Sequence, residues 1–124
     1  IDFPKMFTCS LNFWGCLDPK KYFDEPGDHA GELETSIMMH LEPDLVLPLE
    51  TAGNGAAKNF KIIGLKDGWV TAQRQWTKVT KDTGVGDPAL STAEKGKVYL
   101  KDVTAKISDF FIELERTALE DLYE

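Results

Sequence analysis

The apolar positions along the chain first predict a buried strand and a short helix. Six apolar side chains fall between Lys5 and Trp14 without a helix-breaking residue, which is typical of a buried strand. Residues 31–41 carry Leu, Ile and Met side chains at roughly helical spacing, and Pro43 sets the end of that helix. Between these elements, residues 15–28 collect prolines, glycines and charged residues, which predicts a loop with one short helical turn.

The second half of the chain predicts a long helix preceded by irregular segments. Residues 45–79 hold short apolar pieces around a Gly-Asn-Gly turn, which favours loops and short strands. Two glycines and a proline within residues 83–88 predict a tight loop whose shape depends on its backbone. Ser91 and Glu94 then have the spacing of a capping box, and apolar side chains recur at helical intervals up to about Arg116. The strands predicted along the chain are too few to form a sheet covered by helices on both faces. The pattern therefore indicates an incomplete α/β domain.

Composition and charge narrow the classes of function. The chain has 124 residues, of which 42% are hydrophobic and 28% charged, as in one ordinary globular domain. Its net charge of -7 argues against sequence-independent binding of nucleic acid and against anionic membranes, because both need clustered Lys and Arg. No apolar run approaches the length that crosses a bilayer. Cys9 and Cys16 have no CxxC spacing and indicate reduced thiols in a cytoplasmic protein, with a disulfide as the rarer alternative.

A dense polar cluster surrounds His29 at the start of the predicted short helix. An imidazole titrates near neutral pH, as a proton shuttle in amide hydrolysis must. Glu34 lies in the first helical turn, where it can fold back toward His29 and fix its tautomer. Ala30 and Gly31 are small, which would leave the helix N-terminus open to an anion or to developing negative charge.

Each of these residues also has a simpler explanation, which the spacing alone favours. Glu32 and Glu34 would then only stabilise the helix start, and His29 would be an ordinary loop histidine. His40, at the far end of the same helix, is expected to be a partly exposed surface residue. Trp14 would belong to a core, although ligands also bind at the carboxyl ends of strands in α/β sheets.

Two long strings change this balance. HAGELETSIMMHLEPDLV, which begins at His29, closely resembles the creatininase-family motif in which a His-x-Gly-x-x-Glu-Thr-Ser run opens a helix. TGVGDPALSTAEKG, residues 83–96, is similar to a second signature of that family and follows in the same order. With the segment that ends at Trp14, the resemblance covers most of the chain, and it overrides the simpler explanation of His29 and Glu34.

The resemblance implies a fold, a chemistry and a set of site residues. The expected fold is three-layer α/β/α, with two divalent metal ions, zinc and/or manganese, that activate water to hydrolyse cyclic or simple amide bonds. By position in the motif, His29 would be the catalytic proton shuttle and Glu34 would support it or the substrate. Trp14 would help to enclose a small amide substrate, and Gly31 would belong to the substrate-binding site. Family members assemble as homo-oligomers, often hexamers, which is expected here as well.

The chain departs from the family pattern in two respects. The family's metal ligands come from an N-terminal Glu-x-His…Asp pattern and a later Gly-His-x-Glu motif, and neither occurs in this sequence, so no metal ligand is expected in this chain. We therefore expect residues 1–124 to be the C-terminal portion of one creatininase-like domain, with the N-terminal half as its partner. Residues 23–27 also lack the tryptophan that creatininase itself carries before its catalytic histidine, which argues against creatinine as the substrate.

Several functions stay open at this point. The leading hypothesis is hydrolysis of a cyclic amide or another non-peptide C–N bond. The formamide deformylase and peptidase branches of the same family are alternatives, as is a non-catalytic module that kept the surfaces for subunit assembly.

Overall fold

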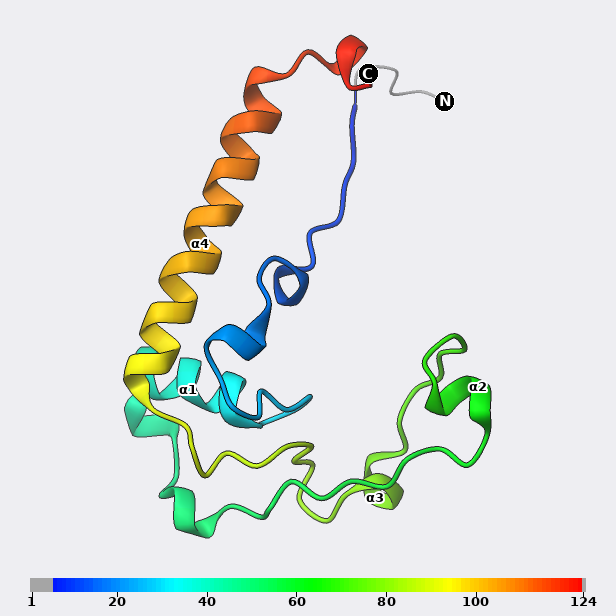
Figure 1. Cartoon of the computed structure of the whole chain (residues 1–124), viewed down its shortest axis with the longest axis vertical. Helices are drawn as coiled ribbons and strands as arrows, with labels where there is room; N and C mark the ends of the chain where they lie inside the picture. The colour runs from blue at the N-terminus through cyan, green and yellow to red at the C-terminus, as the bar shows by residue number, and fades with distance from the viewer. Residues whose placement is uncertain (1–5, 124) are drawn as a thin grey trace.

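The computed structural model describes residues 6–123, and helices dominate this part of the chain (Figure 1). The two principal helices are α1, Glu32–Leu41, and α4, Ala93–Arg116. Two single helical turns, α2 at Ile63–Lys66 and α3 at Trp76–Val79, lie between them in the sequence. The 3₁₀ turns are η1 Phe13–Gly15, η2 Pro19–Lys21, η3 Pro43–Leu45, η4 Leu49–Thr51 and η5 Leu119–Asp121. Within the described residues, no helix is long and apolar enough to cross a membrane.

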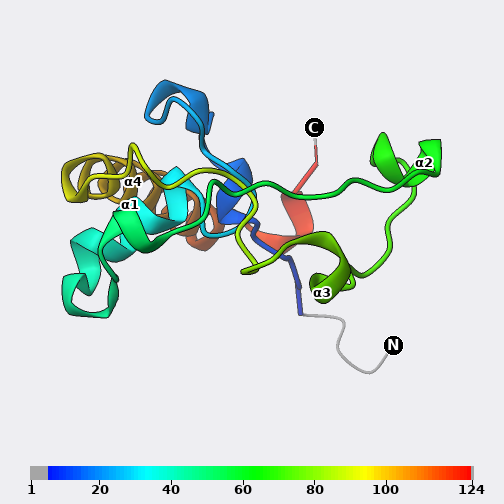
Figure 2. The same cartoon turned by 90° about the horizontal axis from the view of Figure 1, so that it is seen from below.

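The core forms where α1 crosses the N-terminal part of α4 (Figures 1 and 2). Its buried apolar side chains come from the loop before α1 and from both helices: Phe23, Leu33, Tyr99 and Val103. The two helices approach closely because residue 96 is glycine. A Cβ at Gly96 would lie 2.0 Å from the carbonyl oxygen of Ser36, which no side chain can occupy. The sequence of α4 therefore determines how near α1 can lie.

A buried carboxylate also fastens α1 to α4. Glu32 is fully buried, and its carboxylate accepts hydrogen bonds from the ammonium of Lys95 and from the backbone N–H of Glu25, the latter at 2.8 Å. Lys95 also donates to Asp24 at 3.0 Å. These two carboxylates, Glu32 first and Asp24 second, raise the pKa of Lys95 above its ordinary 10.5. Glu32 thus forms a tertiary contact between α1 and α4, in addition to any stabilisation of the helix start.

Both predicted helices are confirmed, with one correction at a helix cap. The short helix begins at Glu32, with Gly31 as its N-cap, and the long helix ends at Arg116. The residue that caps the long helix is Thr92, whose hydroxyl accepts the Lys95 N–H at 3.2 Å. Ser91, which the capping-box spacing singled out, is buried and donates to the Glu32 carbonyl at 3.2 Å. The single helical turn expected within residues 15–28 is confirmed by η2.

The predicted strands are wrong for the residues that the structure describes. Lys5 lies outside them, and residues 6–12 run as an extended segment without ladder hydrogen bonds (Figure 1). Trp14 belongs to η1 instead of a strand. The apolar pieces of residues 45–79 form single helical turns and loops. A strand exists only through a neighbouring strand, and residues 6–123 supply none, so the three-layer arrangement is not visible in this part of the protein.

Residues 53–82, which we call the arm, extend away from α1 and α4 in both views (Figures 1 and 2). The arm doubles back on itself, and the backbone N–H of Lys58 donates to the carbonyl of Val79 at 2.9 Å. At its base, the N–H of Gly86 donates to the carbonyl of Gly55 at 3.0 Å. Several large apolar side chains of the arm are exposed, Trp69 at 75% among them.

Candidate functional site

The two motif segments meet at His29. Its backbone forms an antiparallel bridge with Val85, in which the N–H of Val85 donates to the His29 carbonyl at 2.8 Å and the return bond measures 3.1 Å. The Asp28 N–H donates to the same Val85 carbonyl at 2.7 Å. The tight loop predicted for residues 83–88 thus lies against the segment that carries His29. This loop holds the His29 backbone in place from more than fifty residues away in the sequence.

Three glycines make this junction possible. Gly27 and Gly86 have φ values of +76° and +118°, and a Cβ at Gly86 would lie 2.5 Å from the Cα of Gly27. A Cβ at Gly31 would lie 2.8 Å from that same Cα and 2.9 Å from the Pro26 carbonyl oxygen. Side chains at these positions would push the two motif segments apart.

The same packing corrects the expectation of an open helix entrance at Gly31. Gly31 is buried, and the backbone of residues 26–27 covers it. The Leu33 N–H, which would otherwise be free in the first turn, donates to the Pro26 carbonyl at 3.1 Å. Gly31 therefore packs against the preceding turn. Within the described residues it exposes no surface that a substrate could contact.

Glu34 does fold back toward His29, as predicted. Its Oε2 lies 3.6 Å from His29 Nδ1, which is an ion-pair distance slightly too long for a hydrogen bond. The same oxygen accepts the Ala30 N–H at 2.6 Å. Ala30 has a φ of +51°, a strained conformation for a residue with a Cβ, and this hydrogen bond supports it. Glu34 thus shapes the loop that carries His29 and also places a carboxylate beside its imidazole.

Trp14 and Glu34 line the same cavity, of about 450 Å³, between the first loop and the start of α1. Pro26, Gly27 and Asp28 also contribute to its walls. The Trp14 side chain is 42% exposed and packs against the ring of Phe13, with ring centroids 3.9 Å apart. Trp14 is therefore available at the cavity, and it is not the core residue that its position alone favoured.

The structure adds an aromatic wall that the sequence analysis missed. The ring of Trp76, in α3, lies 5.0 Å from the imidazole of His29 between centroids. The guanidinium of Arg74 lies 5.4 Å from the Trp76 ring centroid and forms an ion pair with Asp28. Arg74 and Trp76 thus connect the arm to Asp28 and His29.

No spacing rule could have identified these partners, since Asp28 and Arg74 are 46 positions apart. One feature of the sequence could have pointed to these partners: an Arg and a Trp lie two residues apart in a segment with little other pattern.

The remaining histidine and the cysteines lie apart from this cluster. His40 is exposed near the end of α1, as predicted. Cys9 and Cys16 are free thiols. Among residues 6–123, no group of three or more His, Cys, Asp or Glu side chains could hold a metal ion. The acidic residues near His29 thus do not converge on a point that a hydrolytic metal could occupy.

Comparison with known proteins gives the family. The creatininase family, described as creatinine amidohydrolase, matches residues 5–111. A crystal structure from Bacteroides fragilis NCTC 9343, named "Putative creatinine amidohydrolase", shares 41% sequence identity and superposes with a TM-score of 0.84. The match covers 99% of this chain and 47% of that one, so this chain spans about half the length of its relative. A comparison with curated proteins found no match.

The chain belongs to the creatininase family, and this part of it has a creatininase-like fold. The resemblance drawn from the two motif strings is confirmed. Family membership supports an amidohydrolase type of function, and the family generally uses divalent metal ions.

Proposed function

We propose that the complete protein is a metal-dependent amidohydrolase that cleaves a cyclic amide or another non-peptide C–N bond, with His29 as the proton shuttle. One observation carries this proposal: both family segments converge on His29, whose Nδ1 lies 3.6 Å from the Glu34 carboxylate. An exposed loop histidine without a function would need neither the Val85 bridge nor a carboxylate beside it.

His29 suits proton transfer because its side chain is 46% exposed while its backbone is held rigidly. Cleavage of an amide C–N bond needs a proton on the departing nitrogen, since an amide anion is a poor leaving group. In the proposal, the imidazole delivers that proton. Glu34 acts as a positioning residue, because its carboxylate accepts the Ala30 N–H and lies 3.6 Å from the His29 imidazole.

In the proposal, two divalent ions, zinc and/or manganese, are bound mainly by the N-terminal half, since no group of three or more possible ligands occurs within residues 6–123. The same proposal makes residues 1–124 the C-terminal portion of one three-layer α/β/α domain in a cytoplasmic homo-oligomer. The N-terminal half would then supply the strands that residues 6–12 lack.

The proposed substrate is a small amide. The cavity beside Trp14 and Glu34 lies in the size range of small-molecule sites. The Trp76 ring against His29 would shield the reacting atoms from water on a second side. An aromatic wall of this kind suits a flat ring or a planar amide group, which stacks on it.

The proposal is tested in the complete protein by comparing the two histidines. We expect His29→Ala to lower turnover by a factor of about 100 to 10,000, the usual worth of general acid–base help. His40→Ala is the matched control, because His40 is exposed near the end of α1, the helix that follows His29, and it should retain full turnover. Elemental analysis of both variants should give the metal content of the unmodified protein.

Other outcomes would redirect the assignment. Loss of metal in His29→Ala would make His29 a ligand. Equal turnover in the two variants would remove His29 from the reaction. A complete, metal-loaded protein that hydrolyses no cyclic amide, formamide or peptide would favour the non-catalytic module. Cleavage of a formamide or a peptide alone would select the deformylase or the peptidase branch.

A further inference from the structure

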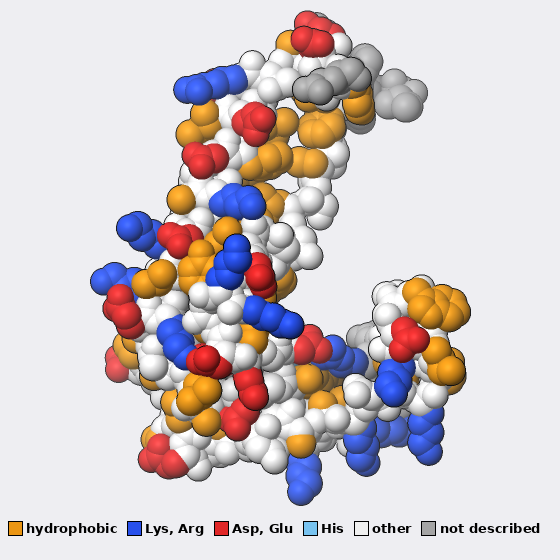
Figure 3. Space-filling model, in the orientation of Figure 1, with side chains coloured by type: hydrophobic (Ala, Val, Ile, Leu, Met, Phe, Trp, Pro, Cys, Tyr) orange, Lys and Arg blue, Asp and Glu red, His pale blue; other side chains and the backbone are white. Residues whose placement is uncertain are grey.

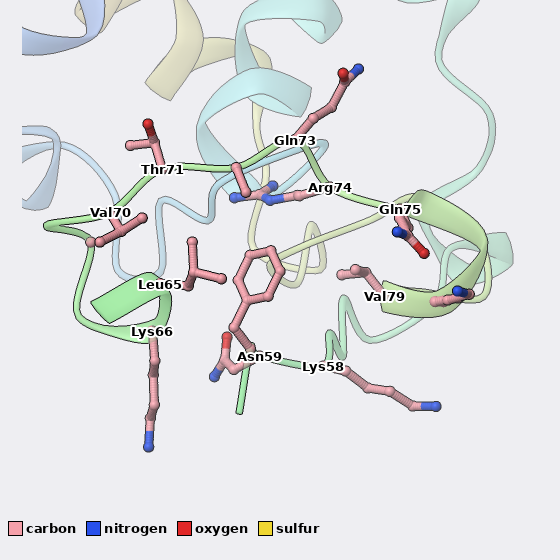
Figure 4. A pocket seen from close by; sticks show the side chains of 14 residues that line it. Lys58, Asn59, Leu65, Lys66, Val70, Thr71, Gln73, Arg74, Gln75 and Val79 are labelled. Carbon is pink, nitrogen blue, oxygen red and sulfur yellow. The ribbon is translucent and has the colours of Figure 1, made fainter. Parts of the chain in front are cut away.

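Arg74 differs from the other basic residues of the arm in its burial. It is partly buried, whereas the five lysines of the arm are all exposed. Basic side chains gather along the outer edge of the arm in the space-filling view (Figure 3). In the close view, Lys58 and Lys66 point away from the loop that the arm makes, while Arg74 lies inside it (Figure 4). Solvation explains an exposed lysine, but a partly buried guanidinium needs partners.

The partners of Arg74 lie beside His29. Its guanidinium forms an ion pair with Asp28, the residue immediately before His29. The same guanidinium lies 5.4 Å from the centroid of the Trp76 ring, and that ring lies 5.0 Å from the imidazole of His29. A guanidinium can make both contacts because it is planar, with N–H donors at its edge and a face that stacks on aromatic rings. Arg74 therefore joins the chain neighbour of His29 to its ring neighbour.

Trp76 has little in its own segment that would hold it in place. α3 has four residues, none of them buried, and no side chain caps its start. A single helical turn of this length is not stable alone. The backbone N–H of Lys58 fastens this part of the arm to the carbonyl of Val79, but that bond leaves the Trp76 side chain free to turn. The position of the Trp76 ring against His29 thus depends on Arg74.

The imidazole of His29 has one partner at its edge and another at its ring. Glu34 Oε2 lies 3.6 Å from Nδ1, and the Trp76 ring is tilted by 47° against the imidazole plane. Because a carboxylate lies beside Nδ1, Nε2 is the nitrogen left to deliver a proton. Proton transfer requires that nitrogen to face the reacting atom, and a misplacement of about 1 Å can lower the rate about 100-fold.

We infer that Arg74 is a positioning residue for the reaction at His29. Its ion pair with Asp28 keeps the Trp76 ring against the imidazole, so that Trp76 and Glu34 together fix the direction of Nε2. Arg74 acts through Asp28 and Trp76 and needs no contact with substrate. The inference rests on the proposed function, because it assigns Arg74 to that same site. It makes the arm a part of the site.

Tryptophan fluorescence of the complete protein tests this geometry without a substrate. A protonated imidazole quenches a neighbouring indole, so the emission of Trp76 should fall between about pH 8 and about pH 5, where imidazoles titrate. Trp76→Phe and His29→Ala should each remove this step. We expect Arg74→Gln to abolish most of it. Lys58→Gln is the matched control, because it removes the same charge from an exposed side chain of the arm, and it should keep the step.

Turnover of the amide that the complete protein hydrolyses gives the second measurement. Arg74→Gln should lower kcat about 10- to 100-fold and leave KM within about twofold, because the orientation of His29 is disturbed and substrate contacts are not. Arg74→Lys should recover part of this loss, since an ammonium keeps the ion pair but lacks the planar face. Asp28→Asn should match Arg74→Gln. The double variant should lose no more than either single variant, as both changes break one ion pair.

These variants separate failure of the proposed function from failure of this inference. If His29→Ala keeps turnover, the proposed function fails, whatever Arg74 does. If His29→Ala loses turnover while Arg74→Gln keeps either the fluorescence step or full kcat, the inference about Arg74 is overturned. A lower unfolding midpoint with unchanged kcat would mean that Arg74 only stabilises the arm. Losses that multiply in the double variant would also overturn the inference, because Asp28 and Arg74 would then act separately.

Discussion

The α1–α4 body and the arm belong to one chain, yet they use apolar side chains in opposite ways. In the body, Tyr99 and Val103 are 0% and 2% exposed. In the arm, Ile63 and Trp69 are 69% and 75% exposed, although they are as hydrophobic. The body therefore buries a small apolar core, although Leu41 and Phe111 on its helices stay 51% and 57% exposed, whereas the large apolar side chains of the arm are mostly exposed.

The difference follows from the length of the elements. Helices of 10 and 24 residues make their backbone hydrogen bonds locally and can present a continuous apolar face to each other. The helical turns of the arm have four residues each, which is too short for a stable face. Local hydrogen bonding and one shared core thus hold the two long helices together, whereas the arm has no buried cluster of its own within the described residues.

The largest expected difference in stability between the two regions comes from truncating one aromatic residue in each. Tyr99→Ala empties the centre of the core and should destabilise the chain by about 3–5 kcal/mol. Trp69→Ala should change the free energy of unfolding by less than about 0.5 kcal/mol, because the side chain is mostly solvated. Urea denaturation followed by circular dichroism measures both. Similar losses would mean that the arm is as well packed as the body.

A smaller effect is expected at the junction between the two regions. Gly86→Val places a Cβ 2.5 Å from the Gly27 backbone at a φ of +118°, and should cost about 2–3 kcal/mol. Gly84 has no positive φ, and the nearest atom to its Cβ is a side-chain oxygen of Asp82 at 3.3 Å. Gly84→Val should therefore cost less than about 1 kcal/mol. The sequence pattern does not distinguish Gly84 from Gly86, and a harmful Gly84→Val would mean that both glycines are required.

Alkaline pH should weaken the body selectively. Hydrogen bonding to Asp102 raises the pKa of Tyr22 above 10.0, burial raises that of Tyr99, and Glu32 raises that of Lys95 above 10.5. Each group holds its proton more tightly in the folded state, so its contribution to stability is full below about pH 10 and is lost as pH rises through the folded pKa. Urea midpoints measured across that range should fall. Tyr22→Phe should flatten the decline, and Lys58→Met in the arm should not.

The smallest effect is expected from a single buried hydroxyl. Tyr99 Oη has no hydrogen-bond partner among the described residues. Tyr99→Phe removes that unpaired group and keeps the ring contacts with Tyr22 and Phe23, so stability should stay constant or rise by up to about 1 kcal/mol. A loss above about 1 kcal/mol would show that the hydroxyl has a partner that the rest of the chain or a second molecule provides.

The candidate site was predictable only in part. His29 and Glu34 were identified through the resemblance of their segment to a family motif, since their spacing alone favoured a simpler explanation, and the structure places the two side chains 3.6 Å apart. Trp76 was not identified, because nothing in the sequence around it marks it as a partner of His29. The expected open helix entrance at Gly31 was wrong because the turn at Pro26 and Gly27 folds over it, and the sequence predicts such a turn but not what it packs against.

The sequence by itself determined the elements whose hydrogen bonds are local: α1, α4 and the tight loop of residues 83–88. Periodicity, caps and glycines encode these within a few positions. The tertiary structure decided the burial of Glu32 against Lys95, the bridge between His29 and Val85, and the Trp76 wall. It also left residues 6–12 without strand partners. Such contacts join residues 47 to 63 positions apart, and their formation depends on how distant segments pack, which spacing along a chain does not record.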